Sequence, residues 1–365
     1  YWPIGIRGVE MRIGRVPTVK GAHTTLRFHL PSSFQRLTEL GSTPHQINIL
    51  RRTIKEPKGL VLMTGPTGSG KTSTLYAALH ELNDGTKHIL TVEDPVEKKV
   101  EGLTQIQISK QLPFKDAIRI ALRKAPKVIL LGEVRDAESA QAAVDSALTG
   151  HLVLSTLHTL DAGRTILRLD QLGIESSLLG DCLKAIMSQR LLARINPAYL
   201  KKMPDGSLTP DERYIESYCL TDELSKLFGG HQFSAQHIGL RPKEFDQVGE
   251  TDYRPHHGRT TCFEILTIDR EIRKQIDKSA SPEDIVRIAM EREKSPYVPM
   301  ELHGLLRVLN NQVTLPEMVR VFGEAWVDDE LYRNAAIGLI ERWLSYPEAS
   351  DDQILYGRGG DLANL

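Results

Sequence analysis

The sequence predicts an α/β fold with a mainly parallel sheet, and three patterns carry this prediction. Short apolar runs recur in the first half of the chain, and segments with helical periodicity separate them. A glycine-rich loop directly follows one of these runs and precedes a helical segment. Acidic residues follow two later runs, at positions that would be strand ends. Repeated β-α units of this kind predict parallel strands covered by helices.

The predicted strands and helices alternate along the core of the chain. Each strand is a short run dominated by Leu, Ile and Val, whereas the helical segments carry apolar residues at helical spacing. We assign residues 59–195 to this core. The strands are predicted at 60–63, 88–92, 128–131 and 152–155, and the clearest helices at 116–124 and 136–148.

The segments outside the core predict other structures. Residues 1–40 alternate like strands that end a sheet-containing domain, and residues 41–58 predict a linker with a helix. Residues 196–260 are rich in Pro, Gly, Asp and His and predict an irregular insertion. Residues 261–345 predict a small helical region, and the Gly/Asp-rich residues 346–365 predict a mobile tail. Because the chain begins with Tyr and not with Met, we expect it to be part of a longer protein.

Composition and charge narrow the possible classes of function. The 365 residues are 40% hydrophobic, which is enough for well-packed cores, and 46 Lys and Arg balance 47 Asp and Glu. This balance provides no general basic surface, so we do not expect nucleic acid as a partner. Three widely separated cysteines predict a reducing, cytoplasmic environment. No apolar run is long enough to span a membrane, so we expect any membrane attachment to go through a partner.

A phosphate-binding loop is the most specific motif. Residues 65–72 read GPTGSGKT and lie between a predicted strand and a helical segment. Glycines let the backbone wrap around a polyphosphate, so that N–H groups and the helix start face its oxygens. In such a loop Lys71 reaches the β- and γ-phosphates and the Thr72 hydroxyl holds Mg²⁺. We therefore expect a nucleoside triphosphate, bound by Gly65, Pro66, Thr67, Gly68, Ser69, Gly70, Lys71, Thr72 and Ser73.

Acidic residues follow the strand predicted at 128–131, at the sheet edge where open α/β folds bind ligands. Glu133 is the candidate catalytic base, because phosphoryl transfer needs a carboxylate aimed at the attacking water. Gly132 stands where such ATPases usually have an aspartate, which leaves a metal ligand on this strand unassigned. A solvated carboxylate at a helix start is the alternative for Glu133. For Asp136, a helix cap is the favoured interpretation.

A second acidic cluster follows the strand predicted at 88–92. Pro95 ends this strand in a turn that would hold Glu93 towards the nucleotide and its metal ion. Thr72 and Glu93 are therefore the candidate Mg²⁺ ligands. A solvated loop carboxylate is the alternative.

Two histidines, His151 and His158, flank the strand predicted at 152–155. An imidazole N–H can donate to a γ-phosphate oxygen, so both histidines are candidate catalytic residues. A structural histidine is the alternative for each.

Four segments occur in one order along the chain: GPTGSGKT, VEDPVE, VILLGEVRD and GHLVLSTLHT. Together they resemble the Walker A, Asp box, Walker B and His box of the secretion ATPase superfamily, in particular the type II secretion and type IV pilus motor ATPases. This resemblance implies a RecA-like motor domain that binds ATP and follows a PAS-like N-terminal domain. It also implies a homohexamer that works with an inner-membrane platform protein, at the cytoplasmic side of a bacterial inner membrane.

The resemblance includes arginines near the N-terminus. Arg7, Arg12 and Arg27 match arginine positions of the family's N-terminal domain. A guanidinium can grip phosphate oxygens bidentately, so these three residues are candidate arginine fingers. Exposed strand residues or internal salt-bridge partners are the alternatives.

Two features of the sequence bear on which branch of this family the chain resembles. The segments TLYA at 74–77 and STLHT at 155–159 resemble assembly and secretion motors more than retraction motors. Assembly and secretion motors commonly carry two Cys-x-x-Cys pairs after a Gln-Arg-Leu segment, which is 189–191 here, yet no such pair follows in this sequence. His256 and His257 have no further ligands at suitable spacing. We therefore predict no zinc.

The expected function is an ATP-hydrolysing hexameric motor that powers pilus assembly or type II-like protein secretion. A retraction motor or a conjugation-type secretion ATPase is the alternative within the family. A DNA-translocating RecA-like motor and a nonhydrolysing nucleotide-gated scaffold are the alternatives outside it. The balanced charge argues against the first of these two, and Glu133 argues against the second.

Overall fold

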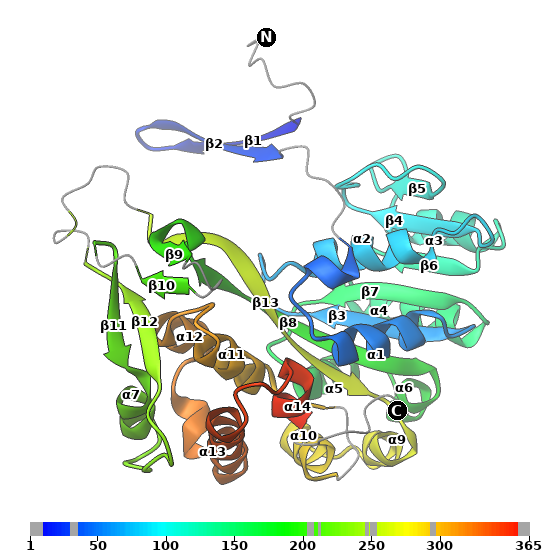
Figure 1. The fold of residues 1–365 in the computed structure, drawn as a ribbon. Helices are drawn as coiled ribbons and strands as arrows, with labels where there is room; N and C mark the ends of the chain where they lie inside the picture. The colour runs from blue at the N-terminus through cyan, green and yellow to red at the C-terminus, as the bar shows by residue number, and fades with distance from the viewer. Residues whose placement is uncertain are drawn as a thin grey trace.

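The computed structural model describes residues 10–29, 36–202, 208–210, 213–244, 248, 254–292 and 297–356 (Figure 1). A central sheet with helices on both faces forms the middle of the chain. A β-hairpin precedes it, and an insertion and a group of helices follow it.

The central sheet has seven strands in the order β13-β8-β3-β7-β6-β4-β5. Every neighbouring pair from β8 to β5 is parallel, and only β13 runs antiparallel to its neighbour β8. The prediction of a mainly parallel α/β fold is therefore confirmed. The strands are β3 (Gly59–Thr64), β4 (Ile89–Glu93), β5 (Thr104–Gln107), β6 (Val128–Leu131), β7 (Leu152–Leu157), β8 (Leu183–Ile195) and β13 (His256–Thr267).

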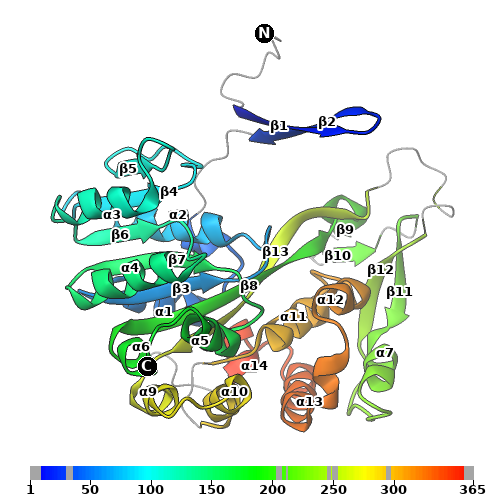
Figure 2. The ribbon, with the colours of Figure 1, turned by 180° about the vertical axis from the view of Figure 1, so that it is seen from behind.

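Helices cover both faces of the sheet, as Figures 1 and 2 show from opposite sides. Alternate residues of β3 point into different cores: Leu60 and Leu62 into one, Val61 and Met63 into the other. Since both faces are buried, the strands are continuous apolar runs without polar alternation. The first core contains α3 (Phe114–Leu122), α4 (Ala137–Leu148), α5 (Ala162–Gln171) and α6 (Ser176–Cys182); the second contains α1 (Pro44–Ile54) and α2 (Lys71–Leu82).

Several helices begin where a side chain caps the first turn. Thr43 accepts a hydrogen bond from the Gln46 N–H at the start of α1, and Asp161 does the same for α5 from the Arg164 N–H. Asp136 accepts from the Ser139 N–H and caps α4. The interpretation of Asp136 as a helix cap is therefore confirmed.

The N-terminal segment forms a hairpin of β1 (Glu10–Thr18) and β2 (Gly21–His29). Its register places Arg12 opposite Arg27 and Ile13 opposite Leu26. Ile13 is 60% exposed and Leu26 49%, so this apolar pair is only half covered. The PAS-like domain that the resemblance implies remains a prediction.

The segment after β8 differs from the sequence prediction at its end. In its described residues the insertion includes two small two-stranded sheets and a helix, but residues 256–267 return as β13 and join the central sheet beside β8. Residues 256–260 were predicted as insertion and 261–267 as helical. The partner of β13 is separated from it by the whole insertion, so no local pattern indicates the pairing. The insertion contains η2 (Pro197–Tyr199), β9 (Leu200–Lys202), β10 (Leu208–Pro210), β11 (Ile215–Cys219), α7 (Leu220–Leu227) and β12 (Ile238–Pro242).

Helices follow β13, as predicted. The first two, in residues 270–291, pack into the first core, whereas the later ones form a third core with α7 of the insertion. Figures 1 and 2 show this helical group between the central sheet and the β11–β12 ribbon. The helices are α9 (Arg270–Asp277), α10 (Pro282–Glu291), α11 (Met300–Leu309), α12 (Leu315–Phe322), η3 (Ala325–Asp328), α13 (Glu330–Ser345) and α14 (Asp351–Tyr356); η1 (Leu37–Glu39) precedes α1.

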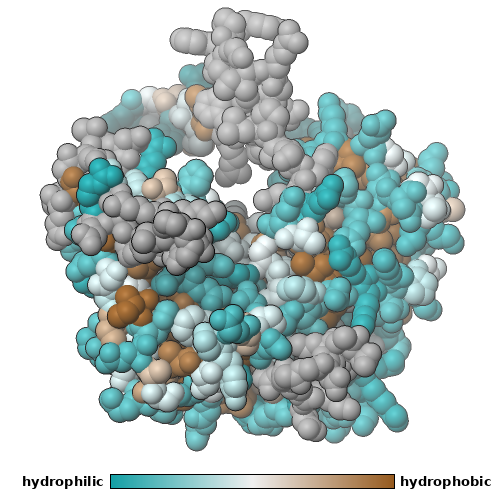
Figure 3. All heavy atoms as spheres, viewed as in Figure 1, coloured by the Kyte–Doolittle hydropathy of each residue, from teal (hydrophilic) through white to brown (hydrophobic). Residues whose placement is uncertain are grey.

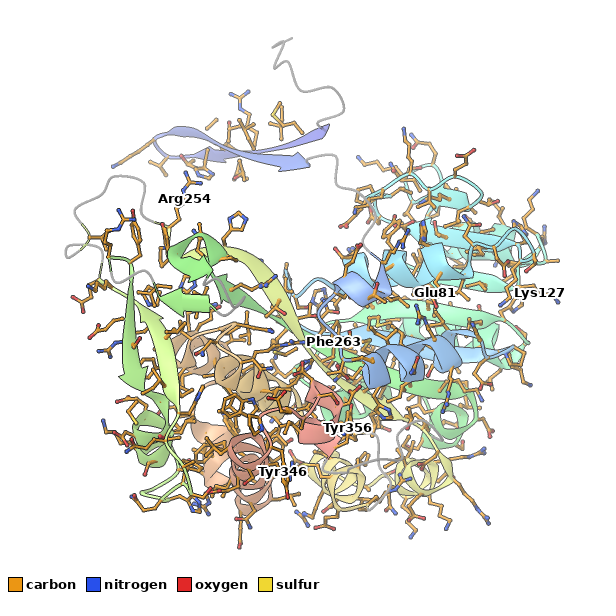
Figure 4. All side chains as sticks on the ribbon, viewed as in Figure 1. Glu81, Lys127, Arg254, Phe263, Tyr346 and Tyr356 are labelled. Carbon is orange, nitrogen blue, oxygen red and sulfur yellow. The ribbon has the colours of Figure 1, made fainter. Side chains whose placement is uncertain are left out.

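The end of the chain also differs from its prediction. Residues 351–356, predicted as part of a mobile tail, form α14, in which Ile354 and Leu355 are buried in the third core. Asp352 accepts a hydrogen bond from the His45 N–H at 3.0 Å. The Tyr356 ring, labelled in Figure 4, lies edge-on to the His45 ring with centroids 4.5 Å apart. These partners lie some 300 residues away, which is why the Gly/Asp-rich sequence alone suggests a tail.

Among the coloured residues on the face that Figure 3 shows, the hydrophobic ones form separate small areas. In the described ranges, no helix has the length and apolarity needed to cross a bilayer.

Candidate active site

A cleft of about 800 Å³ lies at the carboxyl ends of β3, β4, β6 and β7. This is the sheet edge where parallel α/β folds place ligands. Four segments that the sequence singled out meet there, because each follows one of these strands. Lining residues include Thr67, Gly68, Ser69, Gly70, Lys71, Thr72, Ser73, Glu93, Glu133 and His158.

The glycine-rich loop joins β3 to α2, as predicted. Gly65 and Gly70 have φ angles of 143° and 90°, which residues with a side chain rarely adopt. Helix α2 begins at Lys71, so its N-terminus faces the cleft. Unpaired N–H groups and the helix dipole make this end attractive to anions.

Lys71 is held against its own loop. Its Nζ donates to the carbonyl oxygens of Gly65 at 2.7 Å and Pro66 at 3.0 Å, and the residue is 7% exposed. Burial lowers the pKa of Lys71 to about 8, and the nearby Glu133 carboxylate opposes this shift. The ammonium group is thus held by carbonyl oxygens of the loop, and Lys71 lines the cleft.

Glu133 is the centre of a chain of polar contacts. His158 Nε2 lies 3.1 Å from Glu133 Oε1, and Arg135 Nε donates to Oε2 at 2.9 Å. His158 Nδ1 in turn lies 3.4 Å from Lys71 Nζ. Because an ammonium can only donate, this contact assigns Nδ1 as acceptor and Nε2 as the N–H that donates to Glu133. The same arginine approaches Asp94, with Nη1 to Oδ2 at 3.7 Å.

Glu93 lies at the carboxyl end of β4 and is 4% exposed. Tyr76 of α2 donates to its Oε2 at 2.6 Å, and Thr91 donates to its Oε1 at 2.7 Å. Burial and this bond to Glu93 raise the pKa of Tyr76 well above its usual value, so the phenol keeps its proton. The two hydroxyl donors fix the Glu93 carboxylate at the rim of the cleft.

The residues of the loop fit a phosphate group with a magnesium ion. The Ser69 hydroxyl is buried and has no hydrogen-bond partner in the described part of the chain. Buried polar atoms normally have a partner, so this orphan suits an added ligand. Thr72 and Glu93 both line the cleft and would hold Mg²⁺, which prefers oxygen ligands and retains several waters.

Not every predicted site residue lies at the cleft. His151 lies at the opposite end of β7, where its carbonyl accepts from the Gly59 N–H and its Nδ1 lies 2.9 Å from the Ser146 carbonyl oxygen. Its prediction as a phosphate-sensing residue is therefore wrong for the cleft of this chain. The strand between the two histidines is buried over its whole length and separates them.

The candidate arginine fingers are not placed at the cleft by the described structure. Arg7 lies outside the described residues. Arg12 and Arg27 lie within the hairpin, where the register makes them direct cross-strand partners, but their side chains are outside the description. Their role remains a prediction.

The structure adds residues that the sequence argument did not single out. Arg135 and Tyr76 hold the two glutamates. Gln189 and Arg190 of β8 do not line the cleft but bond to segments beside it, and Gln189 Nε2 donates to the Ser69 carbonyl. Arg190 Nη2 donates to the carbonyl of Leu160, directly after the segment that contains His158, at 3.1 Å. Arg135 lies in the strand-end segment that also contains Glu133. Tyr76, Gln189 and Arg190 lie in the family-like segments 74–77 and 189–191, but nothing in those segments indicates their hydrogen-bond partners.

The fold and the cleft define an α/β protein with a phosphate-binding loop at the carboxyl edge of its sheet. The chain matches the model of the family described as type II/IV secretion system protein over residues 3–320. It belongs to this family, as the resemblance of the four segments indicated.

Curated relatives support the same conclusion. The type II secretion system protein E of Aeromonas hydrophila is 37% identical over 324 residues, which is 88% of this chain and 60% of the relative. The type II secretion system ATPase E of Vibrio cholerae is 36% identical over 327 residues, again 88% of this chain and 60% of the relative. The chain thus spans about 60% of the length of these relatives.

A solved structure of the pilus retraction motor PilT with bound ADP is similar, with a TM-score of 0.57 and 25% sequence identity. The match covers 86% of this chain and 75% of that one.

Proposed function

We propose that this chain is the ATP-hydrolysing motor of a type II-like secretion system or of a type IV pilus assembly system. The observation that carries the proposal is the cleft in which Lys71, Glu133 and His158 meet, with contacts of 3.1 Å and 3.4 Å through His158. Curated relatives at 36 to 37% identity favour secretion as the process.

The chemistry of the cleft suits hydrolysis of a phosphoanhydride. Lys71 would leave the loop carbonyls and neutralise the β- and γ-phosphate oxygens. Glu133 would accept the proton of the attacking water through one of the lone pairs that its present partners leave free. His158, which donates to Glu133, would keep the carboxylate in place. Mg²⁺, when bound, would neutralise phosphate charge, with Thr72 and Glu93 as its protein ligands.

We further propose a homohexamer at the cytoplasmic face of a bacterial inner membrane, with a platform protein of the secretion system as partner. The hairpin supports the oligomer, because it carries two arginines in register and a half-exposed apolar pair. Arg12 and Arg27, with Arg7 beside them in sequence, would reach a nucleotide as the hairpin closes on the cleft of the same or a neighbouring chain. Movement of the hairpin against the P-loop domain would then deliver the work.

The test pairs light scattering with steady-state ATP hydrolysis over a dilution series. Activity per chain should rise with the fraction of hexamer, because the arginines are available only when the hairpin is held in place. Arg12→Ala and Arg27→Ala should each lower turnover by at least about 10-fold and change nucleotide affinity far less. Full activity of a monomer, unchanged by both substitutions, would refute the ring mechanism.

Pilus retraction is the second candidate process. The similarity to the retraction motor PilT favours it, although the identity to that chain is lower than to the secretion ATPases. A deletion strain distinguishes the two: loss of secreted protein or of pili indicates secretion or assembly, and an excess of pili indicates retraction.

We also predict that the protein holds no structural zinc. In the residues that the structure describes, no three His, Cys, Asp or Glu side chains form a metal-binding group. Metal analysis of untagged protein should give well under one zinc per chain, whereas one tightly held zinc per chain would contradict the prediction.

A further inference from the structure

Gln189 of β8 lies directly behind the phosphate-binding loop. Its side chain is 1% exposed, and both ends of its amide have partners on the loop–helix segment. Nε2 donates to the Ser69 carbonyl at 2.6 Å, and Oε1 accepts from the Thr74 hydroxyl of α2 at 2.8 Å. One buried amide thus connects the loop, the first turn of α2 and the central sheet.

The bond to Ser69 fixes the orientation of one peptide group in the loop. In a planar trans peptide, the carbonyl and the following N–H point in opposite directions. Because the Ser69 carbonyl points at Gln189, the Gly70 N–H points away from β8. Ser69 and Gly70 line the cleft on the side away from Gln189, so this N–H is available to an anion in the cleft.

Two loop glycines are packed against the same residue. A Cβ added to Gly70 would lie 2.6 Å from Gln189 Nε2, and one added to Gly65 would lie 2.5 Å from the Gln189 carbonyl oxygen. Both distances are shorter than real Cβ contacts allow. The absence of side chains at these positions therefore lets the loop lie close to β8 as well as close to phosphate.

We propose that Gln189 is a positioning residue for nucleotide binding, which holds the Ser69–Gly70 peptide in the orientation that binds phosphate. It acts through the loop and does not touch the nucleotide. This proposal rests on the nucleotide site of the proposed function. Because the peptide would contact ADP and ATP alike, its loss should weaken the binding of both and should affect turnover at saturation less.

Gln189→Glu tests the proposal, because it keeps the shape of the side chain but turns an acceptor towards the Ser69 carbonyl. Gln46→Glu is the matched control. Gln46 is also 1% exposed, and its amide likewise donates to a carbonyl, that of Phe263 at 3.2 Å, and accepts a bond from Thr43 N at 3.1 Å. It lies on α1 and does not line the cleft.

The measurements are the dissociation constant of Mg-ADP, the melting temperature without nucleotide, and kcat and KM for ATP. For Gln189→Glu we expect at least about 10-fold weaker ADP binding and a KM that rises more than kcat falls. For Gln46→Glu we expect a loss in melting temperature similar to that of Gln189→Glu. Its ADP affinity should stay within twofold of wild type. ADP affinity of Gln189→Glu within twofold of wild type would overturn the proposal, and so would an equal loss of affinity in the control.

If Gln189→Glu does not fold, Thr74→Val replaces it. This substitution keeps the volume and removes only the hydroxyl that orients the Gln189 amide. Weaker ADP binding with kcat largely kept supports the proposal, and unchanged ADP binding overturns it. A wild-type protein that binds no ADP would instead refute the nucleotide site itself, so the two failures are distinguishable.

Discussion

The two edges of the parallel sheet carry similar residues in different surroundings. At the carboxyl edge, Glu93 ends one strand, Glu133 and His158 follow two others, and all three line one cleft. At the amino edge, His151 Nδ1 lies 2.9 Å from the Ser146 carbonyl oxygen and His88 Nδ1 lies 3.1 Å from that of Lys124. Lys127 also lies at the amino edge, where Figure 4 labels it at the margin of the molecule.

This difference shows that strand direction decides the chemistry available to a residue. In a parallel sheet the helices that follow the strands begin at the carboxyl edge, so their unpaired N–H groups and positive dipole ends gather there. Helix α2 is the example, since its first residue is Lys71. At the amino edge helices end, and polar side chains such as His151 bond to their last carbonyls. Anions are therefore expected at one edge only.

The largest expected effect comes from Lys71→Ala. It removes the cation that would neutralise the nucleotide phosphates, so ADP binding should weaken by about 10- to 100-fold and turnover should be lost. Lys127→Ala, at the amino edge, is the matched control and should leave both within about twofold. Calorimetric titration and a phosphate-release assay measure these quantities, and near-normal turnover of Lys71→Ala would refute the assignment of the loop.

Glu133→Gln should separate binding from hydrolysis at the same edge. The amide keeps the size of the side chain but cannot accept the proton of water, so turnover should fall by at least about 100-fold. ATP affinity should stay within a few-fold of wild type, because Lys71 and the loop remain. Equal losses of affinity and turnover would indicate that Glu133 holds the metal or the structure and is not the base.

The two histidines allow the most direct comparison of the edges. His158→Ala removes the donor to Glu133 and should lower kcat by about 10- to 100-fold, whereas His151→Ala should change it by less than about twofold. Both variants should be measured at saturating ATP, together with their melting temperatures. Equal losses of kcat in the two variants, without a loss of stability, would contradict the different roles of the two edges. They would indicate that His151 acts on the cleft of another subunit.

The smallest expected effect is a pH dependence of nucleotide binding. Burial lowers the pKa of Lys71 to about 8, so its ammonium loses the proton as the pH rises through 8. Above that pH the affinity for ADP should fall by up to about tenfold per pH unit. Lys71→Arg keeps its charge, so its ADP affinity should stay flat from pH 7 to about 9. A flat profile for the wild type would contradict the lowered pKa.

The same group has the opposite effect on the stability of the nucleotide-free protein. In the unfolded chain Lys71 keeps its proton up to its ordinary pKa of 10.5, so the unfolded state binds more protons than the folded state between about pH 8 and 10.5. The contribution of Lys71 to the free energy of unfolding therefore rises with pH in this window, while nucleotide affinity falls. Melting temperatures of wild type and Lys71→Met at pH 7, 8 and 9 would separate this contribution from that of other groups.

The local sequence was sufficient to predict a feature where the residues that indicate it lie close to the residues that form it. The loop at 65–72, the buried strands before Glu93 and Glu133, and the cap at Asp136 all follow from neighbouring residues, since apolar runs, glycines and capping carboxylates act within a few positions. The strand before His158 gave the same kind of signal. The sequence showed a histidine at each end of this strand, but it did not indicate at which end the cleft lies.

The tertiary structure decided what depends on residues distant in the chain. The pairing of β13 with β8 crosses the insertion, and α14 packs against α1 from the far end of the chain. Gln189 meets the Ser69 carbonyl across 120 positions, and no periodicity or spacing in the sequence indicates that these two residues pair. The sequence by itself determined which residues could bind a phosphate, because backbone conformation and side-chain chemistry are local properties. Which of the candidate residues face one cleft, and what holds the loop in its binding conformation, depended on strand order and packing, which only the folded chain defines.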